Sequence, residues 1–172
     1  MKKVLLAVVC AVLTVASSFA QQGQKAVGIN LGAAPCLEDG ASLTNFQLGA
    51  KFQYNVTDPV RLEAALNYGF EDNYISCLDF AVNAHYLVNL GESFAIYPLA
   101  GIGLARVKAS VPVDTEYGTM DLSESKTRFM FNLGIGGEYN ITDNFAANLE
   151  LKYQYINDFS RLPITIGVAY KF

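Results

Sequence analysis

Hydrophobic and polar residues alternate along most of the chain. Residues 44–56 place every second position in an apolar set, with Asn, Gln, Gly and Lys between them: Phe46, Leu48, Ala50, Phe52, Tyr54 and Val56. The same alternation recurs in residues 60–70, 78–88, 128–139, 145–155 and 164–172, and more weakly in 26–33 and 94–107. A period of two is typical of a β-strand with one apolar and one polar face. The pattern therefore predicts an all-β protein of eight strands.

Connections between these strands alternate in length. Short ones span residues 57–59, 90–93 and 141–144, and longer ones span 34–43, 71–77, 108–126 and 156–163. This predicts an up-and-down antiparallel meander with tight turns at one end, long loops at the other and both termini at the tight-turn end. Residues 46–58 and 131–143 repeat one hairpin, including its Asn, Thr and Asp turn residues. The longest loop, 108–126, is expected to extend its flanking strands into a protruding ribbon.

The first twenty residues have a different character. Lys2 and Lys3 precede an apolar run over residues 4–15, and Ser18, Phe19 and Ala20 follow. A charged start, a short apolar stretch and small residues before the cut are typical of a secretory signal peptide cleaved after Ala20. The apolar run is short for a membrane anchor. We therefore expect a cleaved leader at 1–20 and a single β-barrel domain at 21–172.

Alternation alone leaves open whether the apolar face points inward, as in a soluble lipocalin-like barrel, or outward into lipid. Strands of about eleven residues suffice to cross an outer membrane when tilted. Aromatic residues on the apolar face gather near the strand ends, as interfacial girdles do. Charged residues make up only 16% of the chain, well below the quarter or so of soluble domains. These features favour a transmembrane barrel with an uncharged outer belt.

The signal peptide, the eight alternating strands and the terminal aromatic residue together resemble the small outer-membrane β-barrels of Gram-negative bacteria, which include OmpX- and OmpA-like barrels and porin-like outer membrane protein β-barrel domains. The resemblance implies an eight-stranded antiparallel up-and-down transmembrane barrel in the outer membrane, with periplasmic termini and extracellular long loops. It further implies a monomer in contact with outer-membrane lipid. In that family the outer-membrane assembly machinery recognises the last strand, which here carries Ile164, Ile166, Val168, Tyr170 and Phe172.

Charged residues on the polar face point into the barrel. An eight-stranded barrel is just wide enough to be filled by its own side chains, and unpaired buried charges are costly. We therefore expect a paired polar network in the lumen rather than an aqueous channel, formed by Lys51, Arg61, Glu63, Asp79, His85, Arg128, Glu138, Glu150, Lys152 and Lys171. A narrow porin-like channel for ions or small solutes is the alternative.

Candidate catalytic chemistry is sparse. His85 is the only histidine, lies between Ala84 and Tyr86, and no His-x-Ser arrangement follows it. A general base needs its nucleophile within hydrogen-bond reach, so a lipid-modifying enzyme is the less favoured alternative. We expect no catalytic residue, metal site or cofactor. The pI near 4.9 disfavours a nucleic-acid partner.

Two cysteines remain after removal of the leader, Cys36 and Cys77, both assigned to long loops. In an exported protein they form a candidate disulfide. Arg106, Lys108, Lys126 and Arg161 are candidate contacts to lipopolysaccharide phosphates where the barrel meets the outer leaflet. The sequence thus favours a structural or surface-interaction protein that makes adhesive, host or envelope contacts through its loops.

Overall fold

Ten antiparallel strands make up the fold, and no helix of the described residues is long and apolar enough to cross a membrane. The computed structural model describes residues 22–38, 43–115, 118–157 and 159–172. The expected leader, with its cleavage point after Ala20, lies outside the described residues. The strands are β1 (Lys25–Pro35), β2 (Thr44–Asn55), β3 (Val60–Asp72), β4 (Ile75–Tyr86), β5 (Val88–Asn89), β6 (Phe94–Thr115), β7 (Gly118–Asn140), β8 (Phe145–Ile156), β9 (Phe159–Arg161) and β10 (Ile164–Lys171).

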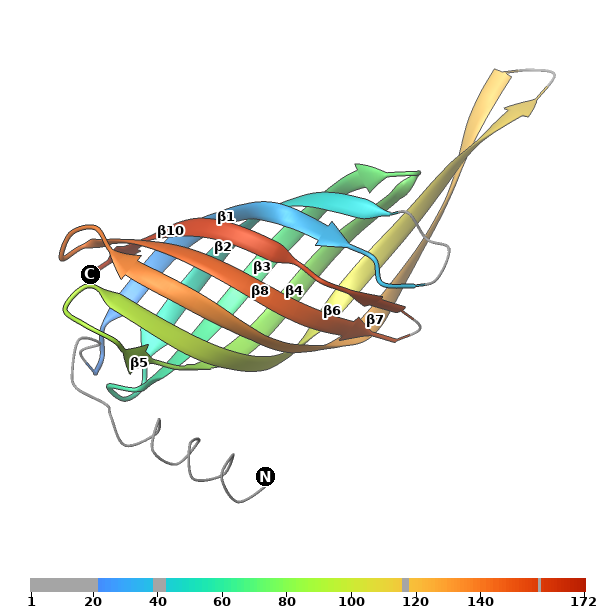
Figure 1. Ribbon diagram of the computed structural model, residues 1–172. Coiled ribbons are helices and arrows are strands. Elements are labelled where there is room, and N and C mark those ends of the chain that lie inside the picture. Colours follow the sequence, from blue (N-terminus) through green and yellow to red (C-terminus); the bar gives the residue numbers. More distant parts are fainter. Residues whose placement is uncertain (1–21, 39–42, 116–117, 158) are drawn as a thin grey trace.

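Eight of these strands form the wall of a closed barrel within the described residues (Figure 1). Each long strand pairs with the next along the chain, and β10 pairs with both β8 and β1. The short strands β5 and β9 pair with β6 and β8. Closure leaves the wall without an open edge. The predicted eight-stranded antiparallel barrel is confirmed.

Two of the tight turns use the repeated sequence in the same way. The Thr57 hydroxyl accepts a hydrogen bond from the backbone N–H of Val60 at 3.1 Å, and the Thr142 hydroxyl accepts one from Phe145 at 3.0 Å. In both turns a threonine side chain satisfies a backbone donor that the strand ladder leaves free. The hairpin repeat in the sequence is therefore a repeat of turn chemistry.

The wall is inside-out relative to a soluble protein. Outward-facing Leu31, Leu133 and Ile166 are 57%, 65% and 58% exposed, whereas inward-facing Glu63 and Glu150 are each 1% exposed. Soluble domains place large apolar side chains inside and leave only small apolar patches on the surface. An apolar belt around a polar interior is the arrangement of a barrel that lies in lipid.

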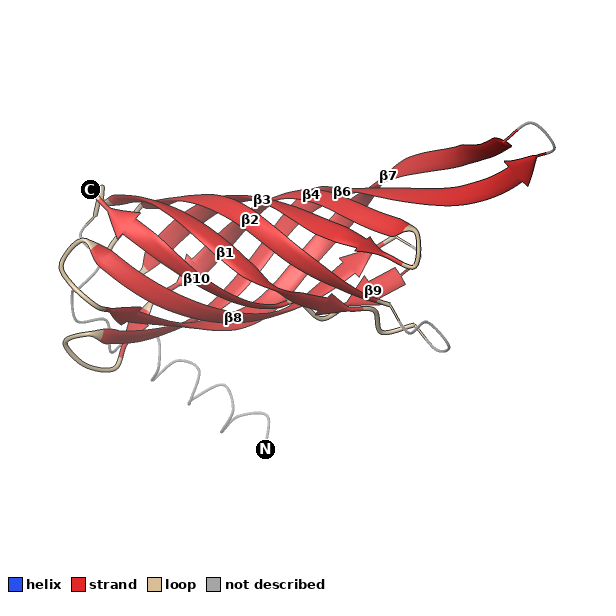
Figure 2. Cartoon of the chain, turned by 90° about the horizontal axis from the view of Figure 1, so that it is seen from above, coloured by secondary structure: helices blue, strands red, loops and turns tan. Residues whose placement is uncertain are grey.

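Strands β6 and β7 continue as a hairpin beyond the rest of the barrel. They pair with each other from Phe94↔Tyr139 to Thr115↔Gly118, but β4 accompanies β6 only to Ala109 and β8 accompanies β7 only from Met130. Figure 2 shows the resulting ribbon projecting past one end. The expectation that segment 108–126 extends two strands is confirmed. We call this end of the barrel the ribbon end, and the opposite end, where the C-terminus lies (Figure 1), the turn end.

Candidate functional site: the lumen and its open end

Glu150 lies at the centre of the polar lumen. One carboxylate oxygen accepts hydrogen bonds from Lys51 Nζ at 3.0 Å and from the Tyr97 hydroxyl at 2.9 Å, and the other accepts one from Lys152 Nζ at 2.9 Å. Lys51 Nζ also donates to Asn148 at 2.9 Å and lies 3.6 Å from Glu63. All these side chains are nearly inaccessible to solvent. The centre of the barrel is therefore occupied by charges that neutralise one another.

A second charged group lies nearer the turn end. Glu138 accepts hydrogen bonds from Arg61 at 2.6 Å and from Lys171 Nζ at 2.7 Å. Arg61 also contacts the Nδ1 atom of His85 and lies with its guanidinium carbon 5.0 Å from the centre of the Tyr97 ring. One carboxylate shared by two cations, with an aromatic face beside one of them, gives a dense electrostatic cluster.

The third group lies nearer the ribbon end and contains Asp79. This carboxylate accepts hydrogen bonds from the Arg161 guanidinium at 2.5 Å and from Asn67 at 2.8 Å, and Arg161 also donates to Gln154 at 2.7 Å. Arg161 was expected on the outer surface as a lipopolysaccharide contact. It is instead 2% exposed, because β9 pairs back onto β8 and sets Arg161 opposite the inward-facing Gln154.

Glycines on the inward face make room for this packing. A Cβ atom at Gly136 would clash with the ring of Tyr97, and one at Gly49 would clash with the amide groups of Asn67 and Asn30. The cavity found nearest Glu138 measures about 20 Å³, room for about one water molecule. Side chains therefore pack closely around Gly49 and Gly136, and the cavity beside Glu138 is small.

His85 is packed into this interior and is 1% exposed. Its ring stacks on Tyr97 with centroids 4.7 Å apart, and its Nε2 atom lies 3.7 Å from Glu63. Its Nδ1 atom faces Arg61. Among the described residues, the His85 ring is thus held between the Tyr97 ring, the Glu63 carboxylate and the Arg61 guanidinium.

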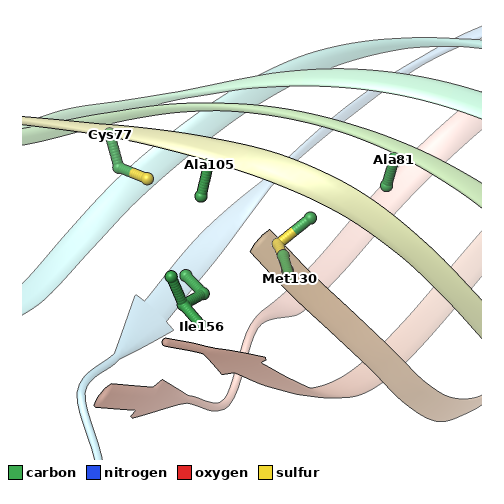
Figure 3. Close-up of a cluster of buried hydrophobic side chains, with 5 residues drawn as sticks. All are labelled: Cys77, Ala81, Ala105, Met130 and Ile156. Atoms are coloured by element: carbon green, nitrogen blue, oxygen red, sulfur yellow. The ribbon is translucent and has the colours of Figure 1, made fainter. Parts of the chain in front are cut away.

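The ribbon end of the lumen has a different character. Here the inward side chains become apolar, with Cys77, Ala81, Ala105, Met130 and Ile156 forming a buried cluster (Figure 3). Above the cluster lies an open pocket of about 400 Å³. Cys36 and Cys77 both line it, as free thiols, so the disulfide considered from the sequence is not formed. Cys77, assigned to a loop from the sequence, belongs to β4 and is 3% exposed.

Four predicted cations surround the ribbon end on different sides of the wall. Lys126 and Arg128 line the inner pocket, where Lys126 pairs with Glu124 at 3.1 Å and Arg128 donates to the Asn157 carbonyl at 2.5 Å. Arg128 was expected in the lumen polar network, and its side chain lines this pocket at the ribbon end of the lumen. Arg106 and Lys108 line a separate groove on the outer face, together with Ser123 and Ser125. Of the expected lipopolysaccharide contacts, Arg106 and Lys108 therefore lie on the outer face, and Lys126 and Arg161 lie on the inner face.

The last strand faces the outer belt. Ile164, Ile166, Val168 and Tyr170 alternate outward with 44–58% exposure, and Phe172 at the end of the chain is 59% exposed. Tyr170 packs beside Phe145 at 5.1 Å and beside Phe172 at 6.4 Å between ring centroids. These aromatic rings mark the turn end of the apolar belt.

Sequence reasoning missed Tyr97 as a functional residue. The segment 94–107 is apolar on both faces, with Ala95, Tyr97 and Leu99 pointing inward opposite Phe94 and Ile96. Alternation therefore could not assign its inner side. Tyr97 is completely buried, donates to Glu150 and stacks on His85. The sequence signal available for it was the alternation of Tyr97 with Leu99, Gly101 and Gly103 on one face of the strand.

Comparison with known proteins agrees with this geometry. The model of the outer membrane protein beta-barrel domain matches residues 5–172. The outer membrane protein PagN of Salmonella typhimurium is 37% identical over 89 residues, which are 49% of this chain and 36% of PagN. The chain therefore spans only about a third of that relative.

Solved structures share the fold at low sequence identity. Neisserial surface protein A superposes with a TM-score of 0.73 at 17% identity, covering 88% of this chain and all of that one. Ail, the attachment invasion locus protein of Yersinia pestis, gives a TM-score of 0.61 at 19% identity with the same coverage. Ail has also been solved with the heparin analogue sucrose octasulfate. From its matched residues and its closed, inside-out barrel, the chain belongs to the outer membrane protein beta-barrel domain family.

Proposed function

We propose that this outer-membrane barrel is a surface-interaction protein, which uses its β6–β7 ribbon for adhesive or envelope contacts and has a lumen closed to solutes. The ribbon carries the proposal, since Ala109 and Glu124 pair where the wall ends and the hairpin continues past them. We further propose that the ribbon end faces the cell exterior and the turn end the periplasm, and that the barrel acts as a monomer.

Relatives support this direction. Ail is described as an attachment invasion locus protein, and its complex with a heparin analogue places a sulfated ligand among those that a barrel of this fold binds. PagN is described as an outer membrane protein, and neisserial surface protein A is described as a surface protein. We therefore include a heparin-coated surface among the test surfaces for this chain.

Shortening the ribbon tests the proposal. Removal of residues 110–123, with Ala109 and Glu124 joined through a two-residue Asn-Gly turn, keeps the pairing of the wall because these two residues are partners. Bacteria displaying the intact chain are expected to adhere to epithelial cells or to heparin-coated wells, and the shortened chain is expected to lose that adhesion. The number of adherent bacteria is normalised to the amount of folded barrel on the cell surface.

The control for this experiment is the barrel itself. Heat-modifiable migration on gels should be the same for both chains, because the Ala109–Glu124 pair and the wall below it are kept. Outside the ribbon, the described residues that are removed give up one backbone hydrogen bond, from Ser110 to the Tyr74 carbonyl. Equal adhesion by the intact and shortened chains, at equal surface levels, would contradict the ribbon as the contact surface.

The outer groove is the proposed lipid contact. Arg106 and Lys108 lie there with Tyr68, Leu78 and three serines around a groove of about 370 Å³, and Arg106 donates to Ser125 at 3.1 Å. Guanidinium, ammonium and hydroxyl groups above an apolar belt suit a phosphate of lipopolysaccharide. Lys126 lines the inner pocket and Arg161 is buried in the lumen, and neither is proposed as a lipid contact.

The double change Arg106→Ala and Lys108→Ala tests this contact. Purified intact barrel should unfold at a higher temperature after addition of lipopolysaccharide, and the double variant should show little of that increase because it lacks both cations. Lys126→Ala, on the other face of the same wall, is the matched control and should respond as the intact chain does. An equal increase in the double variant, or an equal increase with dephosphorylated lipopolysaccharide, would exclude a phosphate site here.

The interior supports a closed lumen over the alternatives. Three groups of paired charges follow one another along the barrel, and the glycines beside Tyr97 and Asn67 leave no room for added atoms. A narrow channel would need a continuous wetted path through these pairs. An enzymatic role would need an accessible nucleophile near His85. We therefore place transport and lipid modification behind the surface-interaction role.

A further inference from the structure

We propose that the open pocket at the ribbon end of the lumen binds a small, uncharged apolar ligand, a single aromatic or short alkyl molecule. This goes beyond the surface-interaction role and does not depend on it, since it concerns the inner face of the wall and not the ribbon. Four features of the pocket indicate such a ligand: its floor, its wall, its rim and its size.

The floor of the pocket leaves no charge for an ionic ligand. Arg161 is the cation at its base, and its guanidinium already donates to Asp79 and Gln154. A charged ligand would have to compete with a buried ion pair for this group, at a considerable cost. The floor therefore acts as a closed surface and not as an anion site.

The side wall of the pocket is largely apolar, although the pocket opens to water. Six side chains from five regions of the chain line it: Ala34, Leu43, Ile75, Val107, Ala109 and Phe159. Val107 and Phe159 pack onto the buried cluster of Cys77 and Met130 below. Apolar surface facing a water-filled space is unfavourable, and an apolar molecule that displaces the water removes this cost.

The rim carries both signs of charge, and its cations already have partners. Glu124 pairs with Lys126 at 3.1 Å, and Arg128 donates to the Asn157 carbonyl. Neither sign dominates the entrance, so neither an anion nor a cation is attracted in preference to a neutral molecule. Electrostatics at the rim therefore agree with the uncharged ligand that the floor indicates.

The size of the pocket limits the ligand. Its volume of about 400 Å³ lies near the lower end of the range of about 300–1,000 Å³ for small-molecule sites. Its polar lining consists of the charges of the floor and rim, Glu38, and Asn45, whose amide nitrogen already donates to the Phe70 and Ile75 carbonyls. We therefore expect recognition by shape and apolar contact.

Methyl NMR of the barrel in lipid nanodiscs tests the proposal, with N-phenyl-1-naphthylamine as the neutral aromatic probe. Methyl groups of Leu43, Ile75 and Val107 line the pocket, whereas those of Leu66 and Ile102 face lipid. We expect saturable shifts at the pocket methyl groups and only a non-saturating drift at the lipid-facing ones. This contrast separates binding in the pocket from partition into the bilayer.

Two variants complete the test. Ala109→Trp fills the pocket and should abolish the saturable shifts, whereas Thr127→Trp, at an exposed position of β7 that does not line the pocket, should leave them. Shifts that persist in Ala109→Trp, or pocket methyl groups that drift like the lipid-facing ones in the intact barrel, would overturn the proposal.

The alkylation rate of Cys77 provides a second measurement of binding, which requires no change to the apolar wall of the pocket. In a Cys36→Ser background, Cys77 is the remaining thiol of the pocket. Its alkylation by N-ethylmaleimide should slow about tenfold when the probe is present at ten times its Kd, because about one site in eleven is then free. An unchanged alkylation rate at that concentration would contradict binding beside Cys77.

Discussion

Replacement of Glu150 by alanine is expected to destabilise the barrel by about 3–5 kcal/mol, the cost typical of removing one partner from a buried ion pair. The carboxylate holds Lys51, Lys152 and the Tyr97 hydroxyl at 2.9–3.0 Å, and it is 1% exposed. Its loss leaves two ammonium groups close together in a space that water does not enter freely. Urea titration of the folded barrel in phospholipid vesicles, followed by heat-modifiable migration, measures the free energy of unfolding.

Glu124→Ala is the matched control for this change. Glu124 also pairs with a lysine, Lys126 at 3.1 Å, but the two side chains are 75% and 64% exposed. Solvent-exposed pairs contribute about 0–1 kcal/mol, so this variant should unfold close to the intact chain. A Glu150→Ala barrel that unfolds within about 1 kcal/mol of the intact chain would mean that water reaches Lys51 and Lys152.

Replacement of Leu66 by arginine is expected to cost about 2–4 kcal/mol, as found for basic residues near the midplane of the lipid face. Leu66 lies near the middle of β3, points outward and is 50% exposed. An arginine there places a guanidinium in hydrocarbon with no partner on the outer face. The measurement is again the urea midpoint in vesicles, at constant lipid composition.

Val56→Arg provides the comparison at the membrane edge. Val56 also points outward, with 38% exposure, but it follows β2 at the turn end. Basic residues near the interface cost only about 0–1 kcal/mol. Equal stabilities of the Leu66→Arg and Val56→Arg barrels would contradict a lipid belt that covers the middle of β3.

The wall of the barrel was predictable because its information is local. Alternation assigned outward Leu48 and Phe52 and inward Lys51 and Gln53 correctly from a dozen residues of sequence. A strand with one apolar face has only one register that keeps this face in lipid. The turns and the ribbon followed from the spacing between the alternating segments.

The charge pairs in the lumen could not be predicted from the local alternation of residues. Lys51 and Glu150 lie 99 positions apart and meet across the lumen, where their contact depends on the tilt and stagger of the whole barrel. Arg161 was misplaced because its strand, β9, folds back onto β8. Tyr97 was missed because its segment is apolar on both faces. The free thiols of Cys36 and Cys77 likewise depend on where β1 ends and where β4 begins in space.

We propose a barrel whose lumen is closed by its own charged side chains. Planar-bilayer recording of the purified, folded protein at neutral pH tests it most directly, with a trimeric porin as the positive control for insertion. The paired charges around Glu150, Glu138 and Asp79 predict a membrane that stays at its baseline conductance after insertion. Steady, ohmic single-channel openings would contradict the closed lumen and favour a narrow channel.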